Sequence, residues 1–409
     1  MASAQIRCVV GIDVAKDLQV VCALEAPGGA LRQRATRIEA SAQGYAQLVQ
    51  WLQAWGEPDT LLIGLEATGV LWEPLYEAVT QAGYSILVLN PRQTSSWAAS
   101  LGLRAKTDSI DAHTLARGLL AGYARASTLP SEAVQSLRTL TRARRDLVQS
   151  QTAARQRLQD ELVPLFPELP RHLPGHADLA DPAILSFLSC YSSAQALARA
   201  DLAEVTDVLA SVSGKRWGEA EAQALQHLAQ HSAASSRAVV ARSLVVRTLC
   251  LHLLDLRARL AELEAAIATV VEEDEEAGRL QQIPGIGPQN AATIRAELGD
   301  VSRFSRVEQV IAYAGLEPRT HESGRFAGQK RLSKRGPGAL RHALYLATLV
   351  AVRFRAEWRL RYQRLLERGR TKKEALTILS RALLKVIYHL LRTGASYDPA
   401  RVGSPGTGS

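Results

Sequence analysis

The chain has 409 residues, which is too long for one ordinary domain and predicts two or three. A hydrophobic fraction of 47% is ample for packed cores and excludes global disorder. The formal net charge is +9, but residues 301–409 alone hold 22 Lys and Arg against 7 Asp and Glu. Such a basic segment behind a near-neutral domain is typical of a protein with a polyphosphate partner. A basic surface kept for solubility is the alternative.

The cysteines are far apart and form no CxxC pair, so the sequence predicts neither a zinc site nor a disulfide framework. The N-terminus shows no basic region followed by an apolar signal core, and no uncharged apolar run reaches membrane-spanning length. We therefore expect a cytoplasmic protein with no membrane partner. The cysteines are Cys8, Cys22, Cys190 and Cys250.

The N-terminal part, residues 1–128, alternates apolar runs with turn residues. Three strands joined by hairpins come first, and helices alternate with two more strands after them. The predicted strands cover residues 6–13, 18–24, 31–38, 60–65 and 84–89. The predicted helices cover residues 41–55, with Ser41 as the N-cap, 71–82 and 108–120. This order predicts a mixed α/β sheet.

The rest of the chain reads as helical. Residues 129–279 are rich in Ala, Leu and charge, which predicts a coiled coil or helical hairpin that serves as a spacer or dimerisation arm. Its predicted helices cover residues 131–163, 193–232 and 236–279, with prolines between the first two. A mostly helical domain is expected over residues 280–395, and a disordered, Gly- and Ser-rich tail over 396–409.

Four carboxylates occur where a two-metal nuclease needs them. Asp13 ends the first strand, Glu66 ends the fourth, and Asp108 and Asp111 share one face of a helix start. Converging carboxylates repel one another unless cations neutralise them, and Mg²⁺ takes such oxygen ligands, with Mn²⁺ as an alternative. Two such ions can polarise a phosphodiester. Each acid taken alone is more simply a turn residue or a cap, and Asp108 could be the N-cap of its helix.

Residues 280–299 predict a helix–hairpin–helix. Its centre, Ile-Pro-Gly-Ile-Gly-Pro at residues 283–288, forms a hairpin that only glycines can turn tightly. The backbone N–H groups of Gly285 and Gly287, near the start of the second helix, are suited to hold a DNA phosphate without reading bases. The alternative is a hairpin that packs against a protein partner.

A polar, glycine-bearing loop over residues 319–336 is dense in Arg and Lys. Ser323 precedes a glycine there and could attack a phosphodiester, with the cations stabilising the transition state and His321 as a candidate base. The simpler alternatives are a turn serine and an exposed histidine, and Ser333 could cap the helix that follows. The predicted phosphate or RNA contacts are Arg325, Lys330, Arg331, Lys334 and Arg335.

Together these motifs resemble the DEDD-type bacterial insertion-sequence transposases. The resemblance covers residues 6–125 and 275–390, and rests on the four acids in order, the hairpin, Ala-Gly-Leu at 314–316, Ser-Gly at 323–324 and Leu-Ser-Lys-Arg-Gly at 332–336. It implies an RNase H-like (RuvC-like) N-terminal domain and a C-terminal transposase domain. It also implies that the four acids bind Mg²⁺ and that Ser323 forms a covalent phosphoserine link.

The resemblance further implies strand exchange through a Holliday-junction-like intermediate. The implied partners are double-stranded donor and target DNA, a structured bridge RNA that pairs with both, and a homodimer or dimer of dimers whose protomers complete each other's sites. The middle, about residues 165–235, looks longer than a minimal family member needs. Two alternatives stay open: a RuvC-like nuclease that hydrolyses DNA with water and does not need Ser323, and a non-enzymatic DNA-bridging protein.

Overall fold

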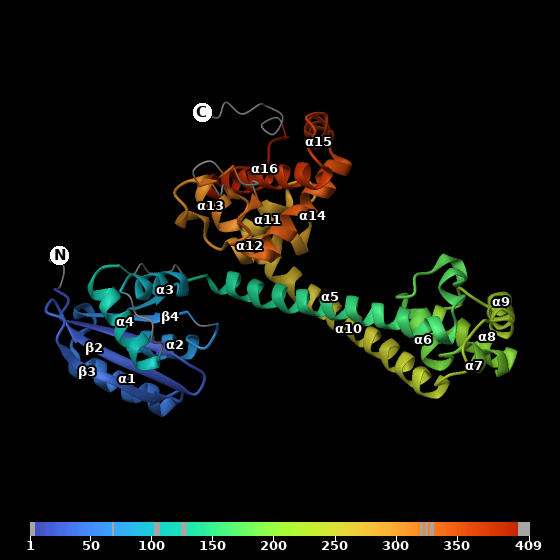
Figure 1. Ribbon diagram of the computed structural model, residues 1–409, viewed down its shortest axis with the longest axis horizontal. Helices are drawn as coiled ribbons and strands as arrows, with labels where there is room; N and C mark the ends of the chain where they lie inside the picture. Colours follow the sequence, from blue (N-terminus) through green and yellow to red (C-terminus); the bar gives the residue numbers. More distant parts are fainter. Residues whose placement is uncertain are drawn as a thin grey trace. The chain divides into compact units, whose positions relative to one another are not determined.

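The computed structural model describes residues 5–67, 69–101, 107–123, 129–319, 322–323, 326–327 and 331–399. For Arg92 and for the residues described within 318–331, it describes the backbone alone. The chain divides after Leu129 into two compact units (Figure 1). In the described part of the chain, no helix is both long and apolar enough to cross a membrane.

The N-terminal unit is built on a five-stranded mixed sheet, which confirms the predicted α/β class. The spatial order is β3-β2-β1-β4-β5. The first three strands pair antiparallel, and β4 and β5 run parallel to β1. The strands are β1 (Cys8–Val14), β2 (Leu18–Glu25), β3 (Leu31–Glu39), β4 (Leu61–Glu66) and β5 (Ile86–Leu89).

Helices cover both faces of this sheet. One face packs on α1 (Ala42–Trp55) and α2 (Glu73–Gln81), and the other on α4 (Asp108–Leu120). The predicted N-cap of α1 is confirmed, because Ser41 Oγ accepts the Gly44 N–H at 3.2 Å. The contact with α4 is close: a Cβ on Gly11 would lie 2.3 Å from the carbonyl oxygen of Ala112. Helix α3 (Pro91–Ser100) follows β5 and was not predicted.

The second unit contains a long antiparallel pair of helices, α5 (Glu132–Leu165) and α10 (Val239–Glu273), which run side by side (Figure 1). Their shared core includes Leu158 and Leu162 of α5 with Val246 and Cys250 of α10. The four cysteines are free, and only Cys190 is exposed. The segment that connects α5 to α10 forms four shorter helices, which pack against the end of α5 and the start of α10. They are α6 (Pro182–Cys190), α7 (Ala194–Arg199), α8 (Leu202–Ser213) and α9 (Glu219–Gln230).

Two predicted long helices prove to be broken. The region 193–232 forms α7, α8 and α9, because Ser193 and Asp201 cap new helix starts and Gly214 ends α8 in a left-handed conformation. The region 236–279 breaks at Asp274, whose side chain accepts the Ala277 N–H at 2.8 Å and starts α11 (Glu275–Gln281). The acidic run at residues 272–276 therefore does not simply end one long helix, because Asp274 within it caps the start of the next helix.

The C-terminal helices share one core with α11, in which Trp358 is fully buried. Tyr397, within the stretch predicted as a tail, packs against this core, and its N–H donates to Gln282 Oε1 at 3.2 Å. The helices are α12 (Pro288–Leu298), α13 (Val307–Ala314), α14 (Gly338–Phe354), α15 (Ala356–Glu367) and α16 (Lys372–Thr393). Short 3₁₀ turns cover Pro58–Thr60, Leu169–Arg171, Pro174–His176 and Val301–Arg303.

Candidate functional site

Asp13 and Glu66 lie side by side at one edge of the sheet. The parallel register pairs Ile12 of β1 with Leu65 of β4, so the next residue of each strand is a carboxylate. Gly11, two residues before Asp13, faces α4, and alternation along the strand puts Asp13 on that face too. On β4, Gly64 faces Leu119 of α4. Glu66 is two residues beyond Gly64, so it lies on the same face. Both carboxylates are half-buried.

The first turn of α4 lies at the same edge. Ala112 contacts Gly11 near the carboxyl end of β1, whereas Leu119 packs with Val9 near its amino end, so α4 begins beside the two strand ends. Asp108 and Asp111 both fall in this turn, with Asp108 exposed and Asp111 half-buried. The N-cap is Thr107, which accepts the Ile110 N–H at 3.3 Å, so the alternative interpretation of Asp108 as the cap is wrong.

The chemistry of this edge fits Mg²⁺, because carboxylate oxygens are the ligands that this ion prefers. Among the described residues, however, no three His, Cys, Asp or Glu side chains come together as a group that could hold a metal ion. The strand register and the start of α4 bring the four acids to one edge of the sheet. Their binding of a metal ion stays a prediction. On α4, burial and the guanidinium of Arg117 lower the pKa of His113, so its imidazole is neutral at neutral pH.

Thr94 belongs to this edge and was missed from the sequence. Its hydroxyl donates to Glu66 Oε2 at 2.6 Å, and the Pro91 carbonyl oxygen lies 3.0 Å from the same hydroxyl. Residues 91–100 are rich in Ser and lack an apolar helical period, so no helix was expected. The usable signal was Asn90-Pro91 directly after a strand, since proline favours the first turn of a helix.

The hairpin between α11 and α12 gives its two glycines different roles. Gly285 has φ +88°, and a Cβ there would lie 2.3 Å from the carbonyl oxygen of Ala347 in α14, so packing and backbone conformation both require glycine. Gly287 precedes α12 with φ −85°, and nothing lies within 4 Å of where its Cβ would be. Phosphate binding by both glycines stays a prediction.

Ser323 lies in a short strand, where a loop was expected. β6 (Pro318–Arg319) pairs with β9 (Arg331–Leu332), and inside them β7 (Glu322–Ser323) pairs with β8 (Phe326–Ala327). In this inner pair, Ser323 lies opposite Phe326. The predicted contacts Arg325 and Lys330, and also His321, lie outside the described residues.

The segment after β9 is held against the end of α13. The Ser333 N–H donates to the Glu317 carbonyl at 3.0 Å, and Arg341 donates to the carbonyls of Ala314 and Gly336 at 3.1 and 2.7 Å. Lys334 and Arg335, both predicted contacts, are exposed. Helix α14 begins only at Gly338, so the interpretation of Ser333 as its cap is wrong.

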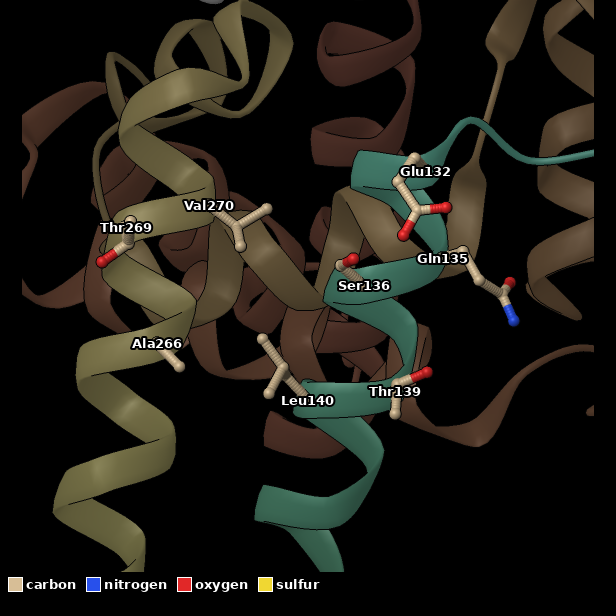
Figure 2. A pocket seen from close by; sticks show the side chains of 8 residues that line it. All are labelled: Glu132, Gln135, Ser136, Thr139, Leu140, Ala266, Thr269 and Val270. Atoms are coloured by element: carbon tan, nitrogen blue, oxygen red, sulfur yellow. The ribbon is translucent and has the colours of Figure 1, made fainter.

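An open groove of about 600 Å³ lies between the start of α5 and the end of α10. Figure 2 shows Leu140 and Val270 projecting into the space between the two helices. Glu132 is the single ionisable residue of its lining. The groove therefore offers no group for the chemistry expected of this protein.

Two transposase family models match the chain. A model described as transposase matches residues 10–167, a range that includes the four acids. A model described as transposase IS116/IS110/IS902 family matches residues 277–363, a range that includes the hairpin and Ser323. Together the two ranges span more than half of the sequence.

Several relatives match along nearly their whole length. The chain is 28% identical to the insertion element IS900 uncharacterized 42 kDa protein of Mycobacterium paratuberculosis, over 90% of this chain and 92% of the relative. It is 24% identical to a pilin gene-inverting protein of Moraxella bovis, over 95% and 97%, and 24% identical to the insertion element IS116 uncharacterized 44.8 kDa protein of Streptomyces clavuligerus, over 98% of each. The chain belongs to the IS110 family of insertion-sequence transposases.

Proposed function

We propose that this transposase cuts and rejoins DNA strands with Mg²⁺ held by Asp13, Glu66, Asp108 and Asp111, and with Ser323 as the nucleophile. The observation that carries the proposal is the shared sheet edge, where two adjacent strand ends and the first turn of α4 all present carboxylates on one face. A mixed sheet with three antiparallel and two parallel strands, covered on both faces by helices, supports an RNase H-like (RuvC-like) domain.

Bound Mg²⁺ supplies the positive charge that polarises the phosphodiester and stabilises the attacking and leaving oxygens. The chain's own residues do the rest. Ser323 Oγ loses its proton and forms a bond to phosphorus, the bond from phosphorus to a deoxyribose oxygen breaks, and that leaving oxygen takes up a proton. The phosphoserine link keeps the bond energy of the broken phosphodiester. A second deoxyribose hydroxyl can therefore attack the same phosphorus, release the serine and rejoin the strands.

The proposed nucleic-acid partners are double-stranded donor and target DNA and a structured guide RNA. An excess of 15 positive charges in residues 301–409 supports binding to phosphate backbones. If base pairing with an RNA selects the DNA site, the protein itself does not need to recognise the base sequence. A hairpin that contacts only phosphate agrees with this division of roles. The relative from Moraxella bovis is a pilin gene-inverting protein, and inversion of a gene requires DNA strands to be cut and rejoined.

Self-association through α10 is part of the proposal. Val240, Leu244 and Leu251 are 86%, 65% and 50% exposed and are spaced by four and seven residues, as along a coiled-coil seam. Exposed alanines continue the same spacing at Ala258 and Ala265. The face of α10 towards α5 is already buried, so this second seam fits another copy of the chain as a homodimer.

The test is a search for DNA covalently attached to protein. Purified protein, Mg²⁺ and its cognate RNA are incubated with labelled DNA that spans the element's junction, and the products are denatured. We expect an adduct that Ser323→Ala and Asp13→Ala abolish and that Ser333→Ala, a serine of the same basic segment, leaves intact. Free cleaved ends without an adduct, lost in Asp13→Ala alone, would instead establish a hydrolytic nuclease.

A further inference from the structure

Phe354 ends α14 with its ring in solvent. The side chain is 67% exposed, although transfer of an aromatic ring from water into a packed interior is strongly favourable. Leu346 and Val350 precede it at four-residue intervals, so one strip of α14 is apolar and open; they are 37% and 40% exposed. The strip therefore has the character of a contact surface.

One guanidinium lies over the ring, and two more arginines follow closely in the chain. The Cζ atom of Arg353 lies 5.4 Å from the centroid of the Phe354 ring. Arg359 folds back from α15 to donate to the carbonyls of Val352 and Arg353, which holds its charge at the end of α14. Arg355, between the two helices, is exposed. An apolar ring with one guanidinium over it and a second at the same helix end matches a ligand that is both aromatic and negatively charged.

The ring also lies on the helix face that supports the α11–α12 hairpin. Gly285 packs on the backbone of Ala347 and Ala351, and Phe354 follows these residues by seven and three positions. Positions with this spacing share one face of a helix, and Phe354 is three residues, about 4.5 Å along the helix axis, beyond Ala351. The exposed ring is thus close, along α14, to the residues on which the hairpin packs.

We propose that Phe354 and Arg353 form a stacking platform for an unpaired base of a nucleic-acid strand whose backbone is held by the hairpin. The inference rests on the nucleic-acid binding proposed above and adds a site for single-stranded bases. Aromatic rings stack on any base, and an adjacent arginine strengthens the contact, so the platform is indifferent to sequence. A duplex keeps its bases stacked inside and cannot use it. Exchange of strands requires bases that have left one pairing and have not entered the next.

The test uses the full-length protein and a single-stranded oligonucleotide that carries 2-aminopurine, with the matching duplex as control. Phe354→Ala and Phe354→Leu should weaken single-strand binding by about tenfold and abolish fluorescence quenching, because one base loses its stacking partner. Phe354→Trp should retain both, and duplex affinity should change less than about twofold in every variant. Leu346→Ala is the matched control, since it removes an exposed apolar side chain from the same strip without removing a ring.

Thermal unfolding must be unchanged in each variant, which the exposure of Phe354 leads us to expect. Wild-type single-strand affinity in Phe354→Ala, with intact duplex binding, would overturn the platform and leave the proposed function standing. Full affinity in Phe354→Leu together with a changed sedimentation coefficient in Phe354→Ala would overturn it in favour of a protein interface. Failure of the wild-type protein to bind either oligonucleotide would overturn both the platform and the proposed function.

Discussion

The hydroxyl of Thr94 donates a hydrogen bond to Glu66 Oε2 at 2.6 Å, which joins the first turn of α3 to the end of β4. One oxygen of the carboxylate is thereby held in place by a hydrogen bond. Groups that orient a metal ligand in this way restrict its rotamers before the ion arrives. Thr94 is therefore a positioning residue for the proposed Mg²⁺ site.

Replacing Thr94 should weaken divalent-metal binding without unfolding the protein. Thr94→Val keeps the shape and removes the donor, so we expect the affinity for Mn²⁺, measured by titration calorimetry, to fall about 10- to 100-fold. Thr94→Ser restores the hydroxyl and should restore binding, and Ser95→Ala, an exposed neighbour on α3, should have no effect. Equal Mn²⁺ affinity in Thr94→Val and wild type would show that this hydrogen bond does not orient a ligand.

The two hairpin glycines should respond differently to alanine. Gly285→Ala forces a Cβ within 2.3 Å of the Ala347 carbonyl at φ +88°, so we expect a loss of at least about 2 kcal/mol in the free energy of unfolding. Gly287→Ala meets no neighbour at φ −85° and should cost less than about 1 kcal/mol. Urea unfolding of both variants measures the difference. Similar losses at both positions would contradict the packing role given to Gly285.

Arg295 is held in a largely buried ion pair that should be costly to break. Its Nε lies 3.1 Å from Asp274 Oδ2, its Nη1 donates to the Gly299 carbonyl at 2.9 Å, and its side chain is 11% exposed. Glu276 Oε2 also lies 2.9 Å from the Arg295 Nη2. Asp274→Ala therefore removes one of two carboxylate partners together with the cap of α11, and we expect destabilisation by about 2–4 kcal/mol. Asp255→Ala, which breaks the exposed pair with Arg259, should cost less than about 1 kcal/mol.

Both variants can be compared by their urea midpoints at constant slope. A cost for Asp274→Ala no greater than that for Asp255→Ala would mean that water reaches Arg295. In that case the pair would not contribute to holding α11 against α12.

Nucleic-acid affinity should fall steeply with salt, because the basic excess lies in residues 301–409. A plot of log Kd against log salt measures how many phosphates the protein neutralises. Replacing both Lys334 and Arg335 with Gln should lower the slope by about 0.9 for each phosphate that the variant no longer neutralises. Lys215→Gln, in the exposed turn between α8 and α9, should leave the slope unchanged. A slope that the double variant does not alter would remove these two residues from the interface.

The exposed seam of α10 predicts how the oligomeric state responds to mutation. Leu244→Glu or Leu251→Glu places a charge in the proposed interface and should shift the protein towards monomer in sedimentation velocity runs, because a buried unpaired carboxylate is costly. Val163→Glu, at a position of α5 that is 65% exposed, should leave the distribution as in wild type. A monomer in the wild-type protein at all concentrations would contradict self-association through α10.

Local patterns in the sequence were enough to identify much of the fold. The hairpin-linked strands, the cap at Ser41 and the helix that starts at Asp108 follow from alternation, capping chemistry and helical period, which act over a few residues. The points at which one helix ends and the next begins were harder to predict, because the composition stays helical across them. Asp274 and Asp201 act as caps only because the chain changes direction there, and an acidic cluster reads equally well as a solvated helix face.

The order of the four acids along the chain was determined by the sequence itself, as was the basic charge of the last quarter. Only the tertiary structure decided that β1 and β4 pair in the register that sets Asp13 beside Glu66, and that Thr94 reaches Glu66 from α3. It also decided that Gly285 must be glycine, because the neighbour that excludes a side chain is the backbone of α14. Strand register and close backbone contacts depend on packing between segments far apart in the chain, and no local period records them.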